Sequence, residues 1–266
     1  MRKWLKIVVV ICLLIGVIIV FVKADEEEAK KQPNLPNISI HADNENAFLT
    51  ELELLTRLKM ERLIFDGQTN EELNINLIEE KISKMEEVKS VLVYRYIGKK
   101  WFIKIILKKP IARIFNSNGK SYYLDEDGNM MNRSELHTAR TLVFSGNIKD
   151  EYSRQSVSDI INNDSLKSIR KLDDIYRISN YVCKDPLFQK LIGQVYLEKD
   201  NDFVLVPLIG DQKIIFGTAY SIEEVEEKFE RLKVFYREAI PYEGWAKYKE
   251  ISVKYDGQIV CRKRGN

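Results

Sequence analysis

The sequence predicts an α+β protein with a single N-terminal transmembrane helix, a small β-α-α-β-β domain and a mostly antiparallel β domain with flanking helices. Three observations lead to this prediction. A long apolar run stands near the N-terminus. Helical spacing of apolar residues then gives way to strand alternation within about seventy residues. Short apolar runs separated by polar turns fill most of the remainder.

The apolar run predicts a membrane anchor. Residues 7–22 carry no charged side chain, with basic residues before them and the acidic stretch 25–28 after them. A helix over residues 4–22 is roughly 28 Å long, close to the hydrocarbon thickness of a bilayer. The positive-inside rule then predicts a cytoplasmic tail of residues 1–3, a span at 4–22 in the lipid bilayer, and N-in, C-out topology.

A cleaved signal peptide is the alternative interpretation of the same run. Val22-Lys23-Ala24 loosely fits a small-residue cleavage site, whereas the apolar run is at or beyond the long end of signal-peptide cores. Both interpretations place the bulk of the chain in the periplasm or outside the cell.

Composition argues against several functional classes. The 266 residues have a formal net charge of +2, which gives no electrostatic reason to expect a nucleic acid partner. The only histidines, His41 and His137, are far apart and lack neighbouring ligands at metal spacing. We therefore expect no catalytic site, metal, cofactor or small-molecule substrate. Cys183 and Cys261 are either a disulfide pair or two buried thiols.

Two domains are predicted beyond a proline-containing linker at 23–37. In the segment 38–110, a short strand near 38–40 precedes two helical stretches, one with Phe48, Leu52, Leu55 and Leu58 on one face, and two strands follow at 90–97 and 101–107. Gly98 is expected to turn the chain between these strands.

The segment 111–264 is the predicted β domain. Its expected elements are strands near 121–124, 141–144, 194–197, 203–208 and 213–216, a helix over 165–182 and a helix after Ser221 that presents Ile222, Val225, Phe229 and Leu232. The acidic stretch 125–129 is interpreted as a hairpin turn, with a calcium loop as the less favoured alternative because the spacing lacks ligands.

The chain ends in a predicted strand pair. Strands at 250–255 and 258–262 are expected to turn at Asp256-Gly257. Tyr242, Trp245 and Tyr248 precede them and are interpreted as core or sheet-face aromatics, with a binding patch as the alternative.

In this order the pieces resemble the FtsQ/DivIB family of bacterial divisome proteins. The resemblance is carried by Ala47-Phe48-Leu49-Thr50, Val88 to Val93, Lys108-Lys109-Pro110-Ile111-Ala112-Arg113, Tyr122 to Met131 (YYLDEDGNMM) and Tyr248 to Arg262 (YKEISVKYDGQIVCR). It implies a POTRA domain over 38–110 and an FtsQ/DivIB-type β domain over 111–264.

The resemblance also implies a function. It implies a non-catalytic scaffold at the division site that binds FtsB- and FtsL-like partners by β-strand addition and links them to septal cell-wall synthesis. The implied partner contacts are Lys254, Tyr255, Gln258, Val260 and Arg262. Taken without the family, Lys254 and Arg262 are better interpreted as part of an ordinary solvated strand face.

Two other functions are compatible with the sequence. One is a POTRA-containing adaptor for envelope assembly or transport. The other is a secreted enzyme that uses paired carboxylates such as Asp125 and Glu135, although such pairs arise by chance in a chain with 40 acidic residues.

Overall fold

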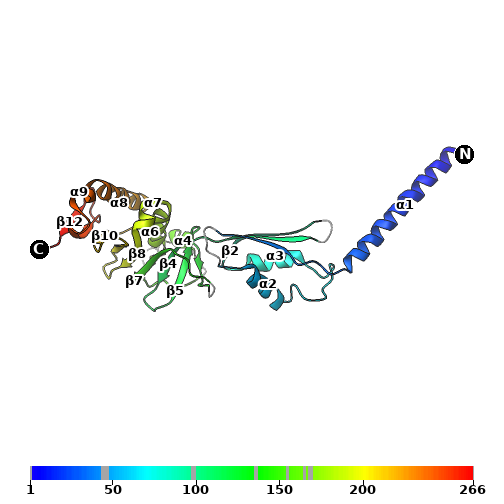
Figure 1. Cartoon of the computed structure of the whole chain (residues 1–266), viewed down its shortest axis with the longest axis horizontal. Helices are drawn as coiled ribbons and strands as arrows, with labels where there is room; N and C mark the ends of the chain where they lie inside the picture. The colour runs from blue at the N-terminus through cyan, green and yellow to red at the C-terminus, as the bar shows by residue number, and fades with distance from the viewer. Residues whose placement is uncertain are drawn as a thin grey trace. The chain divides into compact units, whose positions relative to one another are not determined.

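The chain folds into two compact units (Figure 1). The computed structural model describes residues 2–42, 48–96, 100–134, 137–153, 156–163, 166 and 170–265. Unit 1 comprises residues 1–43 and 49–107, and unit 2 comprises residues 44–48 and 108–266.

The N-terminal segment of unit 1 is a helix, α1 (Arg2–Ala29). It contains the predicted membrane span 4–22. The side chains of residues 5–10 within this span are not among the described side chains. Within the described part of the chain, no helix combines the length and the apolar character that a membrane crossing requires. The span therefore remains a prediction.

The rest of unit 1 has the predicted order of strands and helices. Its elements are β1 (Asn37–His41), α2 (Glu51–Met60), α3 (Ile75–Ser83), β2 (Val88–Arg95) and β3 (Trp101–Leu107). The strands form one sheet in the order β1-β3-β2, with β1 parallel and β2 antiparallel to β3. The helices begin at side-chain caps, since Thr50 Oγ1 and Asn74 Oδ1 accept backbone N–H groups of the first turn.

Strand alternation places the core of unit 1 on one face of its sheet. The predicted inward residues of β3 are all buried and pack with both helices: Trp101, Ile103, Ile105 and Leu107. Figure 1 shows α2 and α3 on one side of this sheet. The second strand starts and ends two residues earlier than predicted, and the predicted turn at Gly98 lies outside the described residues.

The predicted apolar face of α2 is partly wrong. Leu54 and Leu58 are buried, but Leu52 is 77% exposed. The helix starts at Glu51, after the Thr50 cap, so Phe48 does not belong to its spacing. Phe48 instead lies in unit 2, edge-on to Tyr123 at 5.4 Å between ring centroids.

Unit 2 is built on one large mixed sheet. Its strands are β4 (Pro110–Phe115), β5 (Ser121–Asp125), β6 (Met130–Met131), β7 (Leu142–Gly146), β8 (Ile192–Leu197), β9 (Phe203–Pro207), β10 (Lys213–Gly217), β11 (Tyr248–Ser252) and β12 (Val260–Lys263). Its helices are α4 (Val157–Ile161), α6 (Leu172–Lys184), α7 (Pro186–Leu191), α8 (Ile222–Val234), the π-helical turn η1 (Phe235–Ala239) and α9 (Ile240–Glu243).

The strand order of this sheet is β12-β11-β10-β9-β8-β7-β4-β5-β6. Antiparallel pairs predominate, as predicted, but β4–β7, β7–β8 and β10–β11 are parallel. The last two pairs are joined through helical segments, which are the usual crossover between parallel strands. The sequence pattern predicted the strands but not these crossovers.

The helices of unit 2 pack their apolar faces on the sheet in one continuous core. Phe229 of α8 is fully buried and stacks on Tyr181 of α6, with ring centroids 4.5 Å apart and planes at 4°. The predicted face of α8 is correct except for Ile222, which is 59% exposed.

The predicted helix over 165–182 is interrupted just before Leu172, although Leu166 is helical as predicted. In the structure α6 starts at Leu172, where the buried carboxylate of Asp150 accepts the backbone N–H of Lys171 at 3.0 Å. Asp150 is distant in sequence and accepts a backbone N–H at the start of the helix, and the spacing of apolar residues alone does not predict such a contact. Residues 165 and 167–169 of the predicted helix lie outside the described ones.

The acidic stretch 125–129 forms the predicted hairpin turn between β5 and β6. Asp125 Oδ1 accepts the backbone N–H groups of Asp127 at 3.0 Å and Asn129 at 2.7 Å, so this carboxylate holds the turn together. Its suggested catalytic partner, Glu135, lies outside the described residues. Cys183 and Cys261 are both free thiols, so the disulfide alternative is wrong for this structure.

Candidate partner-binding edge

The C-terminal hairpin ends the large sheet of unit 2. β11 and β12 are antiparallel, with Ile251 opposite Cys261 and Glu250 opposite Arg262. β11 also pairs with β10, whereas β12 is the last strand in the sheet order. One side of β12 is therefore an open strand edge, which is a template for pairing with another chain.

Backbone hydrogen bonds show which residues of β12 face this open edge. Val253 donates its N–H to Ile215 O in β10 at 2.9 Å, and Arg264 donates its N–H to Lys247 O at 3.0 Å. Because backbone groups alternate in direction along a strand, Val260 and Arg262 bond toward β11. The N–H and C=O groups of Cys261 and Lys263 consequently face the open edge.

Two of the predicted contact residues lie on β12 itself. The side chain of Val260 is 47% exposed. The guanidinium of Arg262 is solvent-facing and donates from Nη2 to Glu250 Oε2 on the adjacent strand at 2.8 Å. This cross-strand pair holds Arg262 in place, and a partner carboxylate would have to compete with Glu250 for it.

Tyr255 and Gln258 lie in the segment between the two strands. The chain turns at Asp256-Gly257 as predicted, but the predicted strands 250–255 and 258–262 extend too far toward this turn, because the segment 253–259 separates the paired residues Ser252 and Val260. Arg231 of α8 fixes this segment by donating from Nη2 to Val253 O at 3.2 Å. Tyr255 is 51% exposed and has no buried role that would compete with partner binding.

Lys254 is tied to the sheet rather than presented freely. Its ammonium is hydrogen-bonded to the carboxylate of Asp202 in the β8–β9 turn, and this contact raises the pKa of Lys254. Its side chain also lies over Gly217, where an added Cβ would be 2.8 Å from Lys254 Cγ. Of the five predicted residues, Lys254 is therefore the one with the clearest structural role.

A groove lies beside the same segment. It has a volume of about 660 Å³ and is formed by the end of α8, η1 and the 257–259 backbone. Val234, Phe235 and Ile259 give it an apolar lining, and Gln258 stands at its margin. The open edge is thus accompanied by a pocket that can accept a side chain, as strand-addition sites generally require.

The aromatics that precede β11 have different environments. Tyr248 is buried and packs 5.7 Å from Phe235, as the core interpretation predicts. Tyr242 is 89% exposed, so that interpretation is wrong for this residue. Trp245 is 41% exposed and packs on Tyr236 at 5.5 Å.

Sequence reasoning missed four residues that shape this edge. Asp202 and Glu250 pair with the two predicted basic residues, and Cys261 and Lys263 carry the outward backbone groups. Strand alternation would have separated odd from even residues of β12, but only the pairing with β11 decides which set faces outward. The acidic turn 200–202 is visible in the sequence, but nothing in the sequence indicates which residue pairs with Asp202.

Comparison with known families gives a match over most of unit 2. The family model described as FtsQ/DivIB, C-terminal related, matches residues 109–262, which is more than half of the chain. The matched region includes β4 to β11, and with them the hairpin segment that holds all five predicted contacts. A search of curated proteins finds no match.

Proposed function

Because the chain belongs to the FtsQ/DivIB, C-terminal related, family, we propose that it is a non-catalytic, membrane-anchored scaffold of the division machinery. Family membership indicates a role in cell division. The finer proposal is that the chain binds FtsB- and FtsL-like single-pass proteins outside the cytoplasm and links them to septal cell-wall synthesis.

The open edge of β12 is the observation that carries the proposal. It offers unpaired backbone groups at Cys261 and Lys263, solvent-facing side chains at Val260 and Arg262, and an adjacent apolar groove. A partner strand gains affinity from main-chain bonds and specificity from such flanking side chains. The five proposed contacts are Lys254, Tyr255, Gln258, Val260 and Arg262.

The proposal includes anchoring through residues 4–22 with the N-terminus in the cytoplasm. The basic residues before the apolar run and the acidic residues after it support this orientation. A reporter that is active only outside the cytoplasm, fused after Asn266, should be active, and the mature chain should start at Met1. A mature N-terminus at Asp25 would instead show cleavage.

A POTRA role for unit 1 is the second part of the proposal. The β-α-α-β-β order and the one-sided core of its three-stranded sheet support it. In this proposal unit 1 is a separate folded module, and the partner edge belongs to unit 2 alone.

The test compares two exposed tyrosines of unit 2. Tyr255→Glu places a charge at one of the proposed contacts, whereas Tyr242→Glu makes the same change on α9 at a residue that is 89% exposed. Both full-length variants are expressed with FtsB- and FtsL-like proteins of the same organism, and partner affinity is measured after purification. We expect Tyr255→Glu to weaken binding about tenfold or more, as at interface hot spots, with little effect of Tyr242→Glu.

Equal affinity of both variants and the wild-type chain would contradict the site. Partner loss in both variants to the same extent would point to a general effect of added charge.

A further inference from the structure

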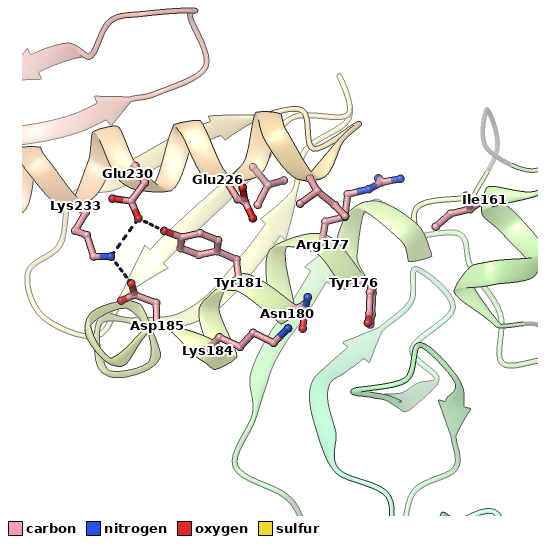
Figure 2. A pocket seen from close by; sticks show the side chains of 12 residues that line it. Ile161, Tyr176, Arg177, Asn180, Tyr181, Lys184, Asp185, Glu226, Glu230 and Lys233 are labelled. Atoms are coloured by element: carbon pink, nitrogen blue, oxygen red, sulfur yellow. Dashed lines mark hydrogen bonds and ion pairs between the residues drawn. The ribbon is translucent and has the colours of Figure 1, made fainter.

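A second groove in unit 2 lies between the helices α6 and α8. It has a volume of about 340 Å³. Figure 2 shows α8 along one wall and α6 along the other, with Ile161 of α4 at one end. Glu230 also lines the groove beside the β12 edge, but none of the five proposed partner contacts lines this second groove, and the proposed strand addition does not use it.

The groove has both buried and exposed apolar side chains in its lining. Val225 is buried and lines the groove together with the ring of Tyr181. Ile222 on α8 is 59% exposed and Ile161 on α4 is 40% exposed. A small ligand within the groove would leave these two isoleucines in water, whereas a helix lying across it would cover both.

Most of the charges around the groove are already paired. At the end nearest the C-terminus of α8, Lys233 binds Asp185 at 2.6 Å and Glu230 at 3.2 Å, and Tyr181 donates to Glu230 at 2.6 Å (Figure 2). Arg177 donates to the carboxylates of α6 and to a backbone carbonyl. These groups fix the walls and leave little charge to offer to a ligand.

Two exposed groups on opposite walls are not used in this way. Lys184 belongs to α6 and Glu226 belongs to α8, and neither has an ion pair or hydrogen bond within the described part of the chain. One wall therefore presents a free ammonium and the other a free carboxylate. Asn180 lies one turn before Lys184 on the same wall and adds an amide that has no hydrogen-bond partner among the described residues.

We propose that this groove docks an amphipathic helix of a partner protein, with mixed charge on its two flanks. Apolar side chains of that helix enter between Ile161 and Ile222. One flank carries carboxylates that meet Lys184, and the other carries basic side chains that meet Glu226. This is the helix-in-groove mode of peptide recognition, with opposite charges on the two walls as its specificity element.

The dimensions suit this occupant. Ile222 and Lys233 bound the α8 wall, so its length is roughly 16 Å, or about three helical turns. The cavity volume is at the lower end for ligand clefts, which is consistent with entry of side chains and not of a whole helix.

The test uses designed helical peptides and the full chain in nanodiscs of zwitterionic lipid. The probe is a fluorescent peptide of about 18 residues, long enough to form a helix, with a leucine stripe, glutamates on one flank and lysines on the other. Two further peptides carry only glutamate or only lysine on both flanks. Binding is read by fluorescence anisotropy. Lipid partition of a peptide is the same for every protein variant, so differences between variants report on the groove.

Charge reversals make the prediction specific. Lys184→Glu gives two acidic walls, so the mixed peptide should bind about five- to tenfold more weakly and the all-lysine peptide should become the preferred one. Glu226→Lys should have the converse effect. The double reversal restores opposite walls, and because a helix can lie in either direction, affinity for the mixed peptide should return.

The controls separate the groove from general effects. Lys190→Glu changes the same net charge on exposed α7 and should leave binding unchanged. Ile222→Asp removes the apolar margin and should abolish binding of all three peptides.

Three results would overturn the proposal. One is the absence of binding of the mixed peptide at about 1 mM. Another is binding that is insensitive to both single reversals. The third is self-association of the chain that Ile222→Asp removes, which would assign the groove to a second copy of this chain.

Discussion

The outward backbone groups of β12 lead to a prediction that separates backbone from side-chain recognition. Lys263→Pro removes an N–H that faces the open edge, whereas Arg262→Pro removes one that bonds to β11. Proline is tolerated in an edge strand only where its missing N–H points away from the sheet. The two neighbouring substitutions should therefore have different consequences.

The magnitudes follow from the bonds that each substitution removes. Lys263→Pro keeps the β11 ladder, so the free energy of unfolding should change by less than about 1 kcal/mol. In the complex it leaves a carbonyl of the partner strand without a donor, which costs about 1–3 kcal/mol, or about five- to 150-fold in affinity. Arg262→Pro should lower the free energy of unfolding as well, by about 1–3 kcal/mol.

The assay is partner affinity together with thermal unfolding of each full-length variant. Lys263→Ala keeps the N–H and loses the side chain, so it is the matched control and should bind nearly as the wild-type chain does. A folded Lys263→Pro variant with wild-type affinity would refute strand addition at this edge. Equal weakening by Lys263→Ala and Lys263→Pro would assign the contact to the side chain.

Two further predictions concern the stability of unit 2. Gly217 has φ +79° and an added Cβ would meet Lys254, so Gly217→Ala should lower the free energy of unfolding by about 1–2 kcal/mol in chemical denaturation. Gly257→Ala is the control, because Gly257 has φ +67° but no described atom lies within 4 Å of an added Cβ, so this change should cost only the backbone strain. Equal effects of the two substitutions would refute a role for the Lys254 contact. Burial raises the pKa of Asp174 to about 6. The folded state therefore binds the proton of this carboxyl group more tightly than the unfolded state does. The stabilisation from this group is present below pH ~4 and should be lost as the pH rises to about 6. Unfolding measured across this range should show a weaker pH dependence in Asp174→Asn, and an unchanged slope would show that Asp174 is not the responsible group.

Local patterns predicted much of the fold because they depend on neighbouring residues. The alternation of Trp101, Ile103, Ile105 and Leu107 predicted a one-sided strand, and all four are buried. The prediction failed at Leu52, because Leu54 and Leu58 define the buried face of the helix and Leu52 lies about 200° from Leu54 around the helix axis.

Long-range pairing limited the prediction of the candidate site. The last strand pair was recognisable from its composition, but the parallel pairing of β10 with β11, which leaves β12 at the edge, involves strands joined through α8. Lys254 looked like a free basic residue because Asp202 is 52 positions away in sequence. The groove between α6 and α8 likewise depends on a tertiary contact between two helices that each show only an ordinary amphipathic pattern.

Residue-resolved hydrogen exchange of β12 tests the central claim most directly. Arg262 bonds to β11, so its amide should be protected in the free full-length chain and in the complex with FtsB- and FtsL-like partners. The amides of Cys261 and Lys263 should exchange rapidly in the free chain and become protected in the complex. Formation of the complex without a change in the exchange of Cys261 and Lys263 would contradict strand addition at β12.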